Sequence, residues 1–260
     1  NSITGKPLKD ENGKTIMQPG TLKGTKAIGW FIEEYGIAQV SMNITDINTT
    51  PLHIAFDEVC RCSQNRGIRV TGTEIVGLIP EHTLLDAGKY FLRKQNRSIG
   101  IPKEDIINIA IKSMGLDDLK PFIPEEKVIE YMLDADKQTK RLTDMTLTNF
   151  ANETARESPA PGGGSVSAYM GALGAALGTM VANLSSHKPG WDDRCTEFSN
   201  HAENGMAIEQ ELLHLVDEVT EAFNKIMAAF GMPKASEEAK RLRAEAIEKA
   251  TLFAAQVPLQ

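Results

Sequence analysis

Three carboxylates in one predicted helix are the best-placed groups for proton transfer. Asp217, Glu218 and Glu221 lie in the segment 196–230, where apolar residues recur at three- and four-residue steps. Asp217 falls at the edge of the apolar stripe, and a carboxylate there can lose part of its hydration and act as a general acid or base near neutral pH. Asp217 is therefore a candidate catalytic residue, although the sequence alone favours the alternative, a solvated acidic face with the same pattern.

A glycine-rich stretch, SPAPGGGS at 158–165, is the second candidate site. Its prolines end the preceding element, and its glycines let the backbone approach a ligand closely. Ser165 is the predicted N-cap of the helix that follows. Unpaired amides and the positive dipole end at such a helix start favour an anion, although a plain linker with a cap has the same sequence. The predicted binding residues are Pro161, Gly162, Gly163, Gly164 and Ser165.

The sequence contains no recognisable pattern for a metal site or for a catalytic serine nucleophile. None of the five histidines forms H-E-x-x-H or lies with cysteines at zinc spacing, and there is no G-x-S-x-G elbow. His53 and Asp57, four positions apart in a predicted helix, are expected to form an exposed pair. The cysteines are Cys60, Cys62 and Cys195, an odd number without a C-x-x-C motif. We predict no metal site, no disulfide framework and a reducing, cytoplasmic location.

Length and charge narrow the functional classes further. The 260 residues are enough for two domains. A net charge of −7 argues against a nucleic-acid binder and against a surface held to acidic lipid. The N-terminal residues are polar and do not resemble a signal peptide. The missing initial methionine, and an end directly after a helical pattern, indicate a piece of a longer chain.

The first half of the chain predicts an α+β domain with helices on one face of a small sheet. Strands are expected at 27–33, 37–45 and 68–79. The second strand alternates, with Gln39, Ser41 and Asn43 on a polar face and Val40 on an apolar face that should enter the core. Helical patterns occupy 51–65, 81–95, 103–114, 125–136 and 141–157.

The second half predicts an all-α bundle, with helices at 166–184, 196–230 and 236–255. No charged residue occurs from Val166 to Ser186, and Gly174 and Gly178 form a G-x-x-x-G pair. This segment is long enough to span a membrane, but it is mostly Ala, Gly and Ser and lacks basic or aromatic flanks. We predict a buried central helix, close helix packing and a homo-oligomer formed through this domain, with domains at 1–138 and 139–260.

Two sets of segments resemble one enzyme family. The stretches GWFIEEYGIAQVSMN at 29–43 and GTEIVGLIP at 72–80 resemble the C-terminal subdomain of glutamate formiminotransferase. Residues 158–180, with LVD at 215–217 and TEAF at 220–223, resemble formiminotetrahydrofolate cyclodeaminase. The order of the two matches the bifunctional formiminotransferase-cyclodeaminases, and the resemblance covers nearly the whole chain.

The resemblance implies transfer of a formimino group from N-formiminoglutamate to tetrahydrofolate in histidine breakdown. It also implies cyclisation of 5-formiminotetrahydrofolate to 5,10-methenyltetrahydrofolate with release of ammonia. The family's transferase histidine lies in an N-terminal subdomain that this chain lacks, so Gln39, Ser41 and Asn43 are expected on the remaining wall of the folate cleft. The glycine loop is expected to hold folate, and Asp217 to move protons.

One position departs from the family pattern. The family commonly has a second aspartate two positions after the one matched by Asp217, and here that position is Val219. If the second aspartate is the essential one, this chain is impaired in the cyclisation. The alternative hypothesis is therefore a non-catalytic module that binds folate and forms oligomers.

Overall fold

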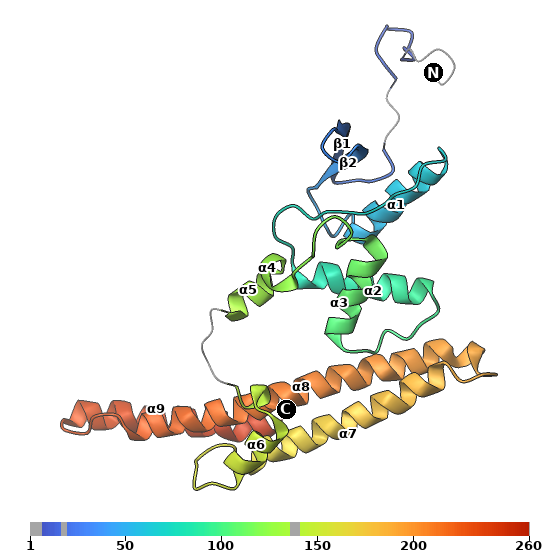
Figure 1. Cartoon of the computed structure of the whole chain (residues 1–260). Helices are drawn as coiled ribbons and strands as arrows, with labels where there is room; N and C mark the ends of the chain where they lie inside the picture. The colour runs from blue at the N-terminus through green and yellow to red at the C-terminus, as the bar shows by residue number, and fades with distance from the viewer. Residues whose placement is uncertain (1–6, 17–19, 136–140, 260) are drawn as a thin grey trace.

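The computed structural model describes residues 7–16, 20–135 and 141–259. An α+β part contains a two-stranded sheet and five helices, and a helical part follows it (Figure 1). This is the predicted order of fold classes. The predicted boundary between 138 and 139 lies outside the described residues.

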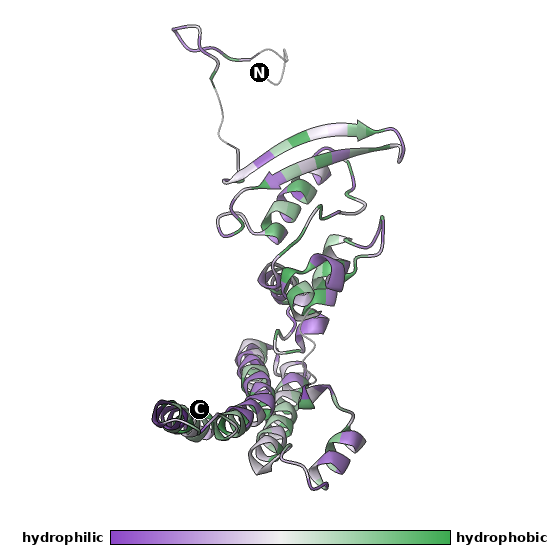
Figure 2. Ribbon diagram, turned by 90° about the vertical axis from the view of Figure 1, so that its left-hand side faces the viewer, coloured by the Kyte–Doolittle hydropathy of each residue, from purple (hydrophilic) through white to green (hydrophobic). Residues whose placement is uncertain are grey.

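The first two predicted strands are present and form a hairpin. Strands β1 (Thr25–Ile32) and β2 (Ile37–Ile44) pair antiparallel, with Trp30 opposite Gln39. Figure 2 shows the hairpin arching over α1 (Leu52–Gln64). The expectation that the apolar face of β2 enters a core is wrong, because Val40 is 50% exposed and Phe31, on the same face, is 64% exposed.

The third predicted strand is wrong. Residues 68–78 form no strand, and Ile79 makes a single parallel bridge to Val128. Two backbone contacts draw this segment away from the hairpin: the Thr73 amide donates to the Gly115 carbonyl (3.0 Å), and the Ile79 amide donates to the Lys127 carbonyl (2.9 Å). Residues 68–78 therefore run as an irregular segment along the helices, despite their β-prone composition.

Four further helices complete the first part: α2 (Glu81–Lys94), α3 (Lys103–Met114), α4 (Pro124–Lys127) and α5 (Ile129–Ala135). Their core includes Leu84, Phe91, Ile107, Met114 and Val128. α2 and α3 cross at Gly88, where an added Cβ would lie 2.1 Å from the Ile106 carbonyl oxygen. Only glycine permits this crossing without a shift of the backbone.

His53 and Asp57 on α1 do not form the expected exposed pair. His53 is buried, and its ring stacks on Tyr90 with 4.5 Å between centroids. The Asp57 carboxylate instead accepts from the Tyr90 hydroxyl and pairs with Lys94 Nζ at 2.7 Å. Both residues therefore join α1 to α2, which is a structural role.

This burial predicts a pH dependence of stability. Desolvation lowers the pKa of His53, with partial opposition from Asp86 and Asp57. Below about pH 6.5 the unfolded chain gains a proton that folded His53 resists, so stability falls as the pH falls through that value. His53→Phe should remove this part of the decline in Tm between pH 8 and pH 5, measured by circular dichroism. His82→Asn, an exposed position on α2, is the control and should keep the slope; an unchanged slope in His53→Phe would contradict the assignment.

The helical part is built on two long antiparallel helices, α7 (Gly163–Ser186) and α8 (Cys195–Phe230), with α9 (Glu237–Gln256) returning along α8 (Figure 1). α7 and α8 approach closely, as their small residues predict. An added Cβ on Gly205 of α8 would lie 2.2 Å from Thr179 Oγ1. Ser236 caps α9, accepting from the Ala239 amide at 3.1 Å.

The helix predicted at 141–157 is interrupted. A short turn η1 (Leu142–Asp144) comes first, and α6 (Leu147–Thr154) begins after Thr146, whose hydroxyl accepts from the Asn149 amide. The backbone leaves the helical region at Met145, whose φ and ψ are −77° and 146°. The Leu142 amide, which would have no partner in the first turn of a helix, donates to Asp217 on α8.

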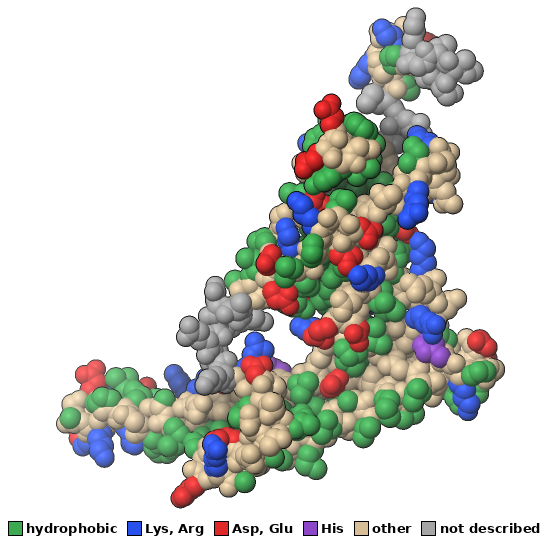
Figure 3. Space-filling view, in the orientation of Figure 1, with side chains coloured by type: hydrophobic (Ala, Val, Ile, Leu, Met, Phe, Trp, Pro, Cys, Tyr) green, Lys and Arg blue, Asp and Glu red, His purple; other side chains and the backbone are tan. Residues whose placement is uncertain are grey.

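The prediction that α7 is a buried central helix is wrong for the described residues. One face packs on α8, while Leu177 and Leu184 of the opposite face are 61% and 68% exposed. Figure 3 shows hydrophobic side chains gathered along the lower edge of the molecule, where α7 runs. Within the described part of the chain, α7 is the one helix whose length and composition would let it cross a membrane.

The α2–α3 loop docks the first part onto the α7–α8 pair. The Ile99 amide donates to Ser199 Oγ (3.1 Å), and Asn183 Nδ2 donates to the Gly100 carbonyl (2.6 Å). An added Cβ on Gly100 would lie 2.2 Å from the carbonyl carbon of Ala202 on α8. The backbone of the loop therefore lies directly against α8, and this contact fixes the space between the two parts.

Candidate functional site

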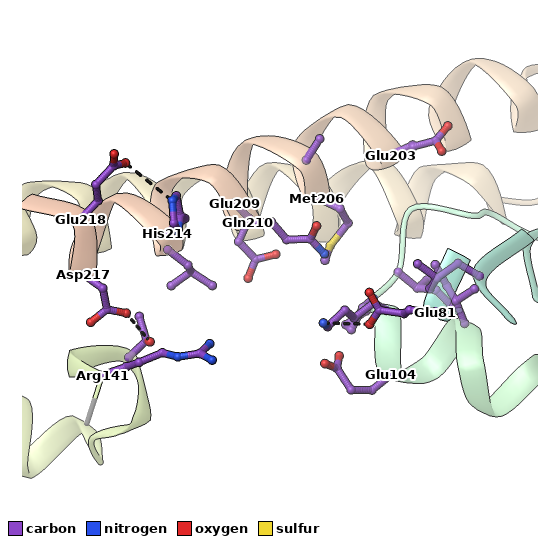
Figure 4. A pocket seen from close by; sticks show the side chains of 18 of the residues that line it. Glu81, Glu104, Arg141, Glu203, Met206, Glu209, Gln210, His214, Asp217 and Glu218 are labelled. Carbon is purple, nitrogen blue, oxygen red and sulfur yellow. Dashed lines mark hydrogen bonds and ion pairs between the residues drawn. The ribbon is translucent and has the colours of Figure 1, made fainter. Parts of the chain in front are cut away.

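A cleft of about 1040 Å³ lies between the two parts of the fold. One wall is α8, and the other is formed by the starts of α2 and α3 with the loop between those helices. Residues 141–143 close one end (Figure 4). Asp217, Glu218 and Glu221 all line this cleft, so the carboxylates singled out from the sequence do face a common space.

Asp217 is held by the segment that begins at Arg141. Its Oδ1 accepts from the Leu142 amide at 2.6 Å, and its Oδ2 accepts from Thr143 Oγ1 at 2.7 Å. The side chain is half-buried. Each carboxylate oxygen has a second lone pair, so both contacts leave acceptor capacity facing the cleft. The arrangement fixes the carboxylate in one orientation, which a group that exchanges protons with a bound substrate requires.

The cleft carries many charges of both signs. Glu81 pairs with Lys103 (3.0 Å), and Glu203 pairs with Lys89 (2.7 Å). Glu209 points into the cleft from α8 and faces Glu104 across it (Figure 4). Burial raises the pKa of Glu209, and the Glu104 charge raises it further. Sequence reasoning missed this pair because the two residues are far apart in the chain and nothing local marks either one.

The glycine loop leads into α7, but not as predicted. Helix α7 begins at Gly163 with Gly162 as its N-cap, so the predicted N-cap role of Ser165 is wrong. Ser165 is buried inside the first turn, and its hydroxyl donates to the Val216 carbonyl at 2.7 Å. Gly162, Gly163 and Gly164 are exposed and Pro161 is buried. The open amides are therefore those of the glycines, and the serine ties the loop to α8.

This tie predicts a stability effect. Ser165→Ala removes the hydroxyl that donates to Val216 and lies 3.3 Å from Thr220 Oγ1, so the free energy of unfolding should fall by about 1 kcal/mol. Urea denaturation followed by circular dichroism measures the change. Ser167→Ala, two positions along on the exposed side of α7, should be neutral. Equal effects in the two variants would show that the buried hydrogen bond contributes nothing.

The glycine loop and Asp217 lie on different sides of one turn of α8. Val219 faces the loop, because an added Cβ on Gly164 would lie 2.8 Å from Val219 Cγ1. Asp217 faces the cleft, whose lining does not include the loop. Thr220 contacts both regions, since it lines the cleft and also lies beside Ser165 of the glycine loop. An aspartate at 219 would thus stand at the start of α7 and not in the cleft.

The three hairpin candidates are not brought to this site. Gln39, Ser41 and Asn43 lie on β2, at the far end of the fold from α8 (Figure 1). Gln39 Oε1 accepts from Trp30 Nε1 at 2.8 Å. The three side chains share a face with Trp30 and Ile28, so this face is mixed and not polar. Any folate contact they make belongs to a second, separate site.

Metal binding has no evident location in the described ranges. No three or more His, Cys, Asp and Glu side chains gather there in a way that could hold an ion. Cys60, Cys62 and Cys195 are free thiols. The predicted absence of a metal cofactor stays a prediction.

Comparisons with known proteins agree on both halves of the chain. Residues 7–134 match the model of the formiminotransferase domain, and residues 146–260 match that of formiminotransferase-cyclodeaminase. The formimidoyltransferase-cyclodeaminase of Gallus gallus is 37% identical over 95% of this chain and 46% of its own length, and that of Mus musculus is 36% identical over 96% and 46%. A methenyltetrahydrofolate cyclohydrolase of Methylorubrum extorquens is 35% identical over 44% of this chain and 55% of its own length. The chain thus spans about half the length of the relatives that match both halves.

Proposed function

We propose, because this chain belongs to the formiminotransferase-cyclodeaminase family, that it is part of a folate-dependent enzyme of histidine breakdown. The enzyme would transfer the formimino group of N-formiminoglutamate to tetrahydrofolate and cyclise the product to 5,10-methenyltetrahydrofolate. The observation that carries the proposal is that two family models match in order, over 7–134 and 146–260. A fixed carboxylate in the cleft between the two matched regions supports it.

Asp217 is the proposed proton carrier of the cyclisation. N10 of 5-formiminotetrahydrofolate attacks the formimino carbon, and a carbon–nitrogen bond forms. N10 then gives up its proton, the exocyclic amine takes one up, and the carbon–nitrogen bond to that amine breaks to release ammonia. A carboxylate that accepts the first proton and donates the second ends the cycle unchanged. Its contacts with Leu142 and Thr143 would hold it in place during both transfers.

Tetrahydrofolate is the proposed substrate, without a metal. Its glutamate tail is anionic, and the exposed amides of Gly162, Gly163 and Gly164 at the start of α7 suit a carboxylate, although this loop lies outside the cleft that Asp217 lines. Pro161 and Ser165 would shape that loop, since both are buried. Gln39, Ser41 and Asn43 would belong to the separate transferase site on the hairpin.

A folate-binding module without catalysis is the second candidate. One feature favours it: this chain has Val219 where the resemblance described above implies a second aspartate. In that case the helical part would hold folate and assemble copies of the chain, and no ammonia would be released.

Location and partners follow from composition. We propose a cytoplasmic protein that forms homo-oligomers through its helical part and binds neither nucleic acid nor membrane. Three free thiols and a net charge of −7 support this assignment.

The test is the reaction itself. The chain is mixed with 5-formiminotetrahydrofolate, methenyltetrahydrofolate is followed by its absorbance, and ammonia is measured separately. Both products in equal amounts are expected. Bound folate without turnover would support the non-catalytic module, and consumption of added methenyltetrahydrofolate without ammonia would support a cyclohydrolase.

A further inference from the structure

Within the residues that the structure describes, the first part of the fold is bonded to one end of α8. The contacts run from Cys195 to Glu203 and comprise a thiol–carbonyl contact with Asn96, a hydrogen bond from the Ile99 amide and an ion pair with Lys89. We call this set of contacts the pivot. The cleft continues along α8 from the pivot for about 32 Å of helix, as far as position 224. A rotation about the pivot would therefore change the width of the cleft.

The pivot is small and polar. It uses backbone groups of the α2–α3 loop, namely the Ile99 amide and the Gly100 carbonyl, which accepts from Asn183 Nδ2 of α7 at 2.6 Å. Asn183 Oδ1 is buried at this contact and accepts no hydrogen bond from the described residues. Helices end on both sides of the loop, since α2 ends at Lys94 and α3 begins at Lys103. Parts of a chain that are joined through a contact of this kind are expected to move relative to one another.

Several of the charges that line the cleft are paired. Glu81 pairs with Lys103 at 3.0 Å, on the wall that belongs to the first part. Glu203 pairs with Lys89 in the pivot. The other charged or titratable groups of the lining are Glu104 on α3, Arg141 next to η1, and Glu209, His214, Asp217, Glu218 and Glu221 on α8.

Glu104 and Glu209 face each other across the cleft, one from each part of the fold (Figure 4). Neither side chain has a hydrogen bond or an ion pair with a described residue. Glu209 is half-buried. Burial raises the pKa of Glu209, and the Glu104 charge raises it further. Two like charges that face each other across a gap oppose its closing for as long as both are ionised.

The remaining groups on α8 act within one part of the fold. His214 lies 3.6 Å from Glu218 on the same helix. Asp217 is bonded to residues 142 and 143, which belong with α8 to the helical part. Glu221 is exposed and lies about 18 Å along α8 from Glu209. A change in the charge of Glu209 is therefore the change on α8 that acts most directly between the two parts.

We propose that the first part of the fold turns about the pivot relative to α7 and α8, and that repulsion between Glu104 and Glu209 holds the cleft open at neutral pH. A proton on Glu209 removes one of the two charges, so the cleft narrows as the pH falls. The proton acts as the ligand of this switch, because it binds the narrowed form more tightly. Asp217 lines the same cleft, so its access to solvent changes with the width. The switch is a property of the fold and goes beyond the reaction proposed above.

Distances between two spin labels, measured by double electron–electron resonance, test the movement. In a parent chain with Cys60, Cys62 and Cys195 replaced by serine, the labels are attached at Asn108→Cys on α3 and Asn224→Cys on α8, both exposed positions. The mean distance should be shorter at pH 5 than at pH 8. Because position 224 lies about 32 Å from the pivot, a rotation of about 5° would shorten it by up to about 3 Å. The change should occur above pH 4.5, the ordinary pKa of a glutamate, since the pKa of Glu209 is raised.

Glu209→Gln is the variant that removes the switch. It should have the short distance already at pH 8 and should not respond to pH. Glu211→Gln, at an exposed position of α8 outside the lining of the cleft, is the matched control and should respond as the parent chain does. His214→Asn should also keep the response, which separates Glu209 from a lining residue of the type that changes charge between pH 5 and pH 8. Circular dichroism checks that all variants fold.

Two further measurements separate a rotation from a general loosening. Labels at Arg97→Cys and Thr196→Cys, on the two sides of the pivot, should keep the same distance at both pH values. At pH 8, 1 M sodium chloride shortens the screening length to about 3 Å and should narrow the cleft of the parent chain, but not that of Glu209→Gln.

Four results would overturn the proposal. They are an unchanged distance between positions 108 and 224 in the parent chain, a full pH response in Glu209→Gln, a lost response in His214→Asn, and a change in the distance between positions 97 and 196. None of these measurements uses folate, so the switch and the proposed reaction can fail separately.

Discussion

Asp217→Asn should lower the rate of ammonia release from 5-formiminotetrahydrofolate by about 10²- to 10⁴-fold, the usual contribution of a positioned acid or base. The asparagine can keep the local geometry, because its oxygen accepts from the Leu142 amide and its nitrogen can donate to the Thr143 hydroxyl. It cannot take up or give back a proton. The measurement is single-turnover formation of methenyltetrahydrofolate, with folate binding measured alongside.

Glu221→Gln is the matched control. Glu221 lies one helical turn from Asp217, lines the same cleft and is exposed. It should retain the wild-type rate. Equal losses in the two variants would point to the charge of the cleft as a whole, and full activity in Asp217→Asn would remove Asp217 from the mechanism.

Gly100→Ala is expected to separate the two parts of the fold. The new methyl group would lie 2.2 Å from the carbonyl carbon of Ala202, where only backbone movement can make room. Overpacking of this kind costs about 1–3 kcal/mol, and the loop would also lose its bonds from Asn183 and to Ser199. We expect a lower Tm and a larger radius of gyration by small-angle X-ray scattering.

Gly20→Ala controls for the loss of a glycine as such, because nothing lies within 4 Å of an added Cβ there. Its Tm and radius of gyration should equal those of the wild type. If Gly100→Ala also matched the wild type, the contact between the α2–α3 loop and α8 would not be what holds the two parts together.

Local signals predicted the elements better than the contacts between them. The hairpin turn at Gly36 and the cap of α9 at Ser236 depend on a few neighbouring residues, and both were predictable. The strand expected at 68–79 was not, because β-prone residues there bond to Gly115 and Lys127 from distant segments. The contact of the Leu142 amide with Asp217 was equally unpredictable, since the two residues lie 75 positions apart.

In the candidate site, too, local features were predictable and contacts between distant segments were not. Asp217 could be singled out because its position beside an apolar stripe is a property of one helix, and it does line the cleft. Glu104 and Glu209 were missed because their proximity depends on how α3 docks near α8. Ser165 was predicted to accept from amides of its own helix, but its hydroxyl donates to the Val216 carbonyl on α8. Sequence periodicity locates a face and does not identify what lies opposite it.

The close packing of Gly100 against α8 affects whether the two parts of this protein can be expressed separately. By position in the chain, Ser98, Ile99 and Gly100 belong to the first half, yet all three are buried and two of them bond to α7 or α8. If the chain were divided in the connecting segment, these residues would become solvent-exposed on one fragment and Ala202 on the other. Separately expressed halves would each carry an exposed docking face, and their solubility and activity would misrepresent the intact chain.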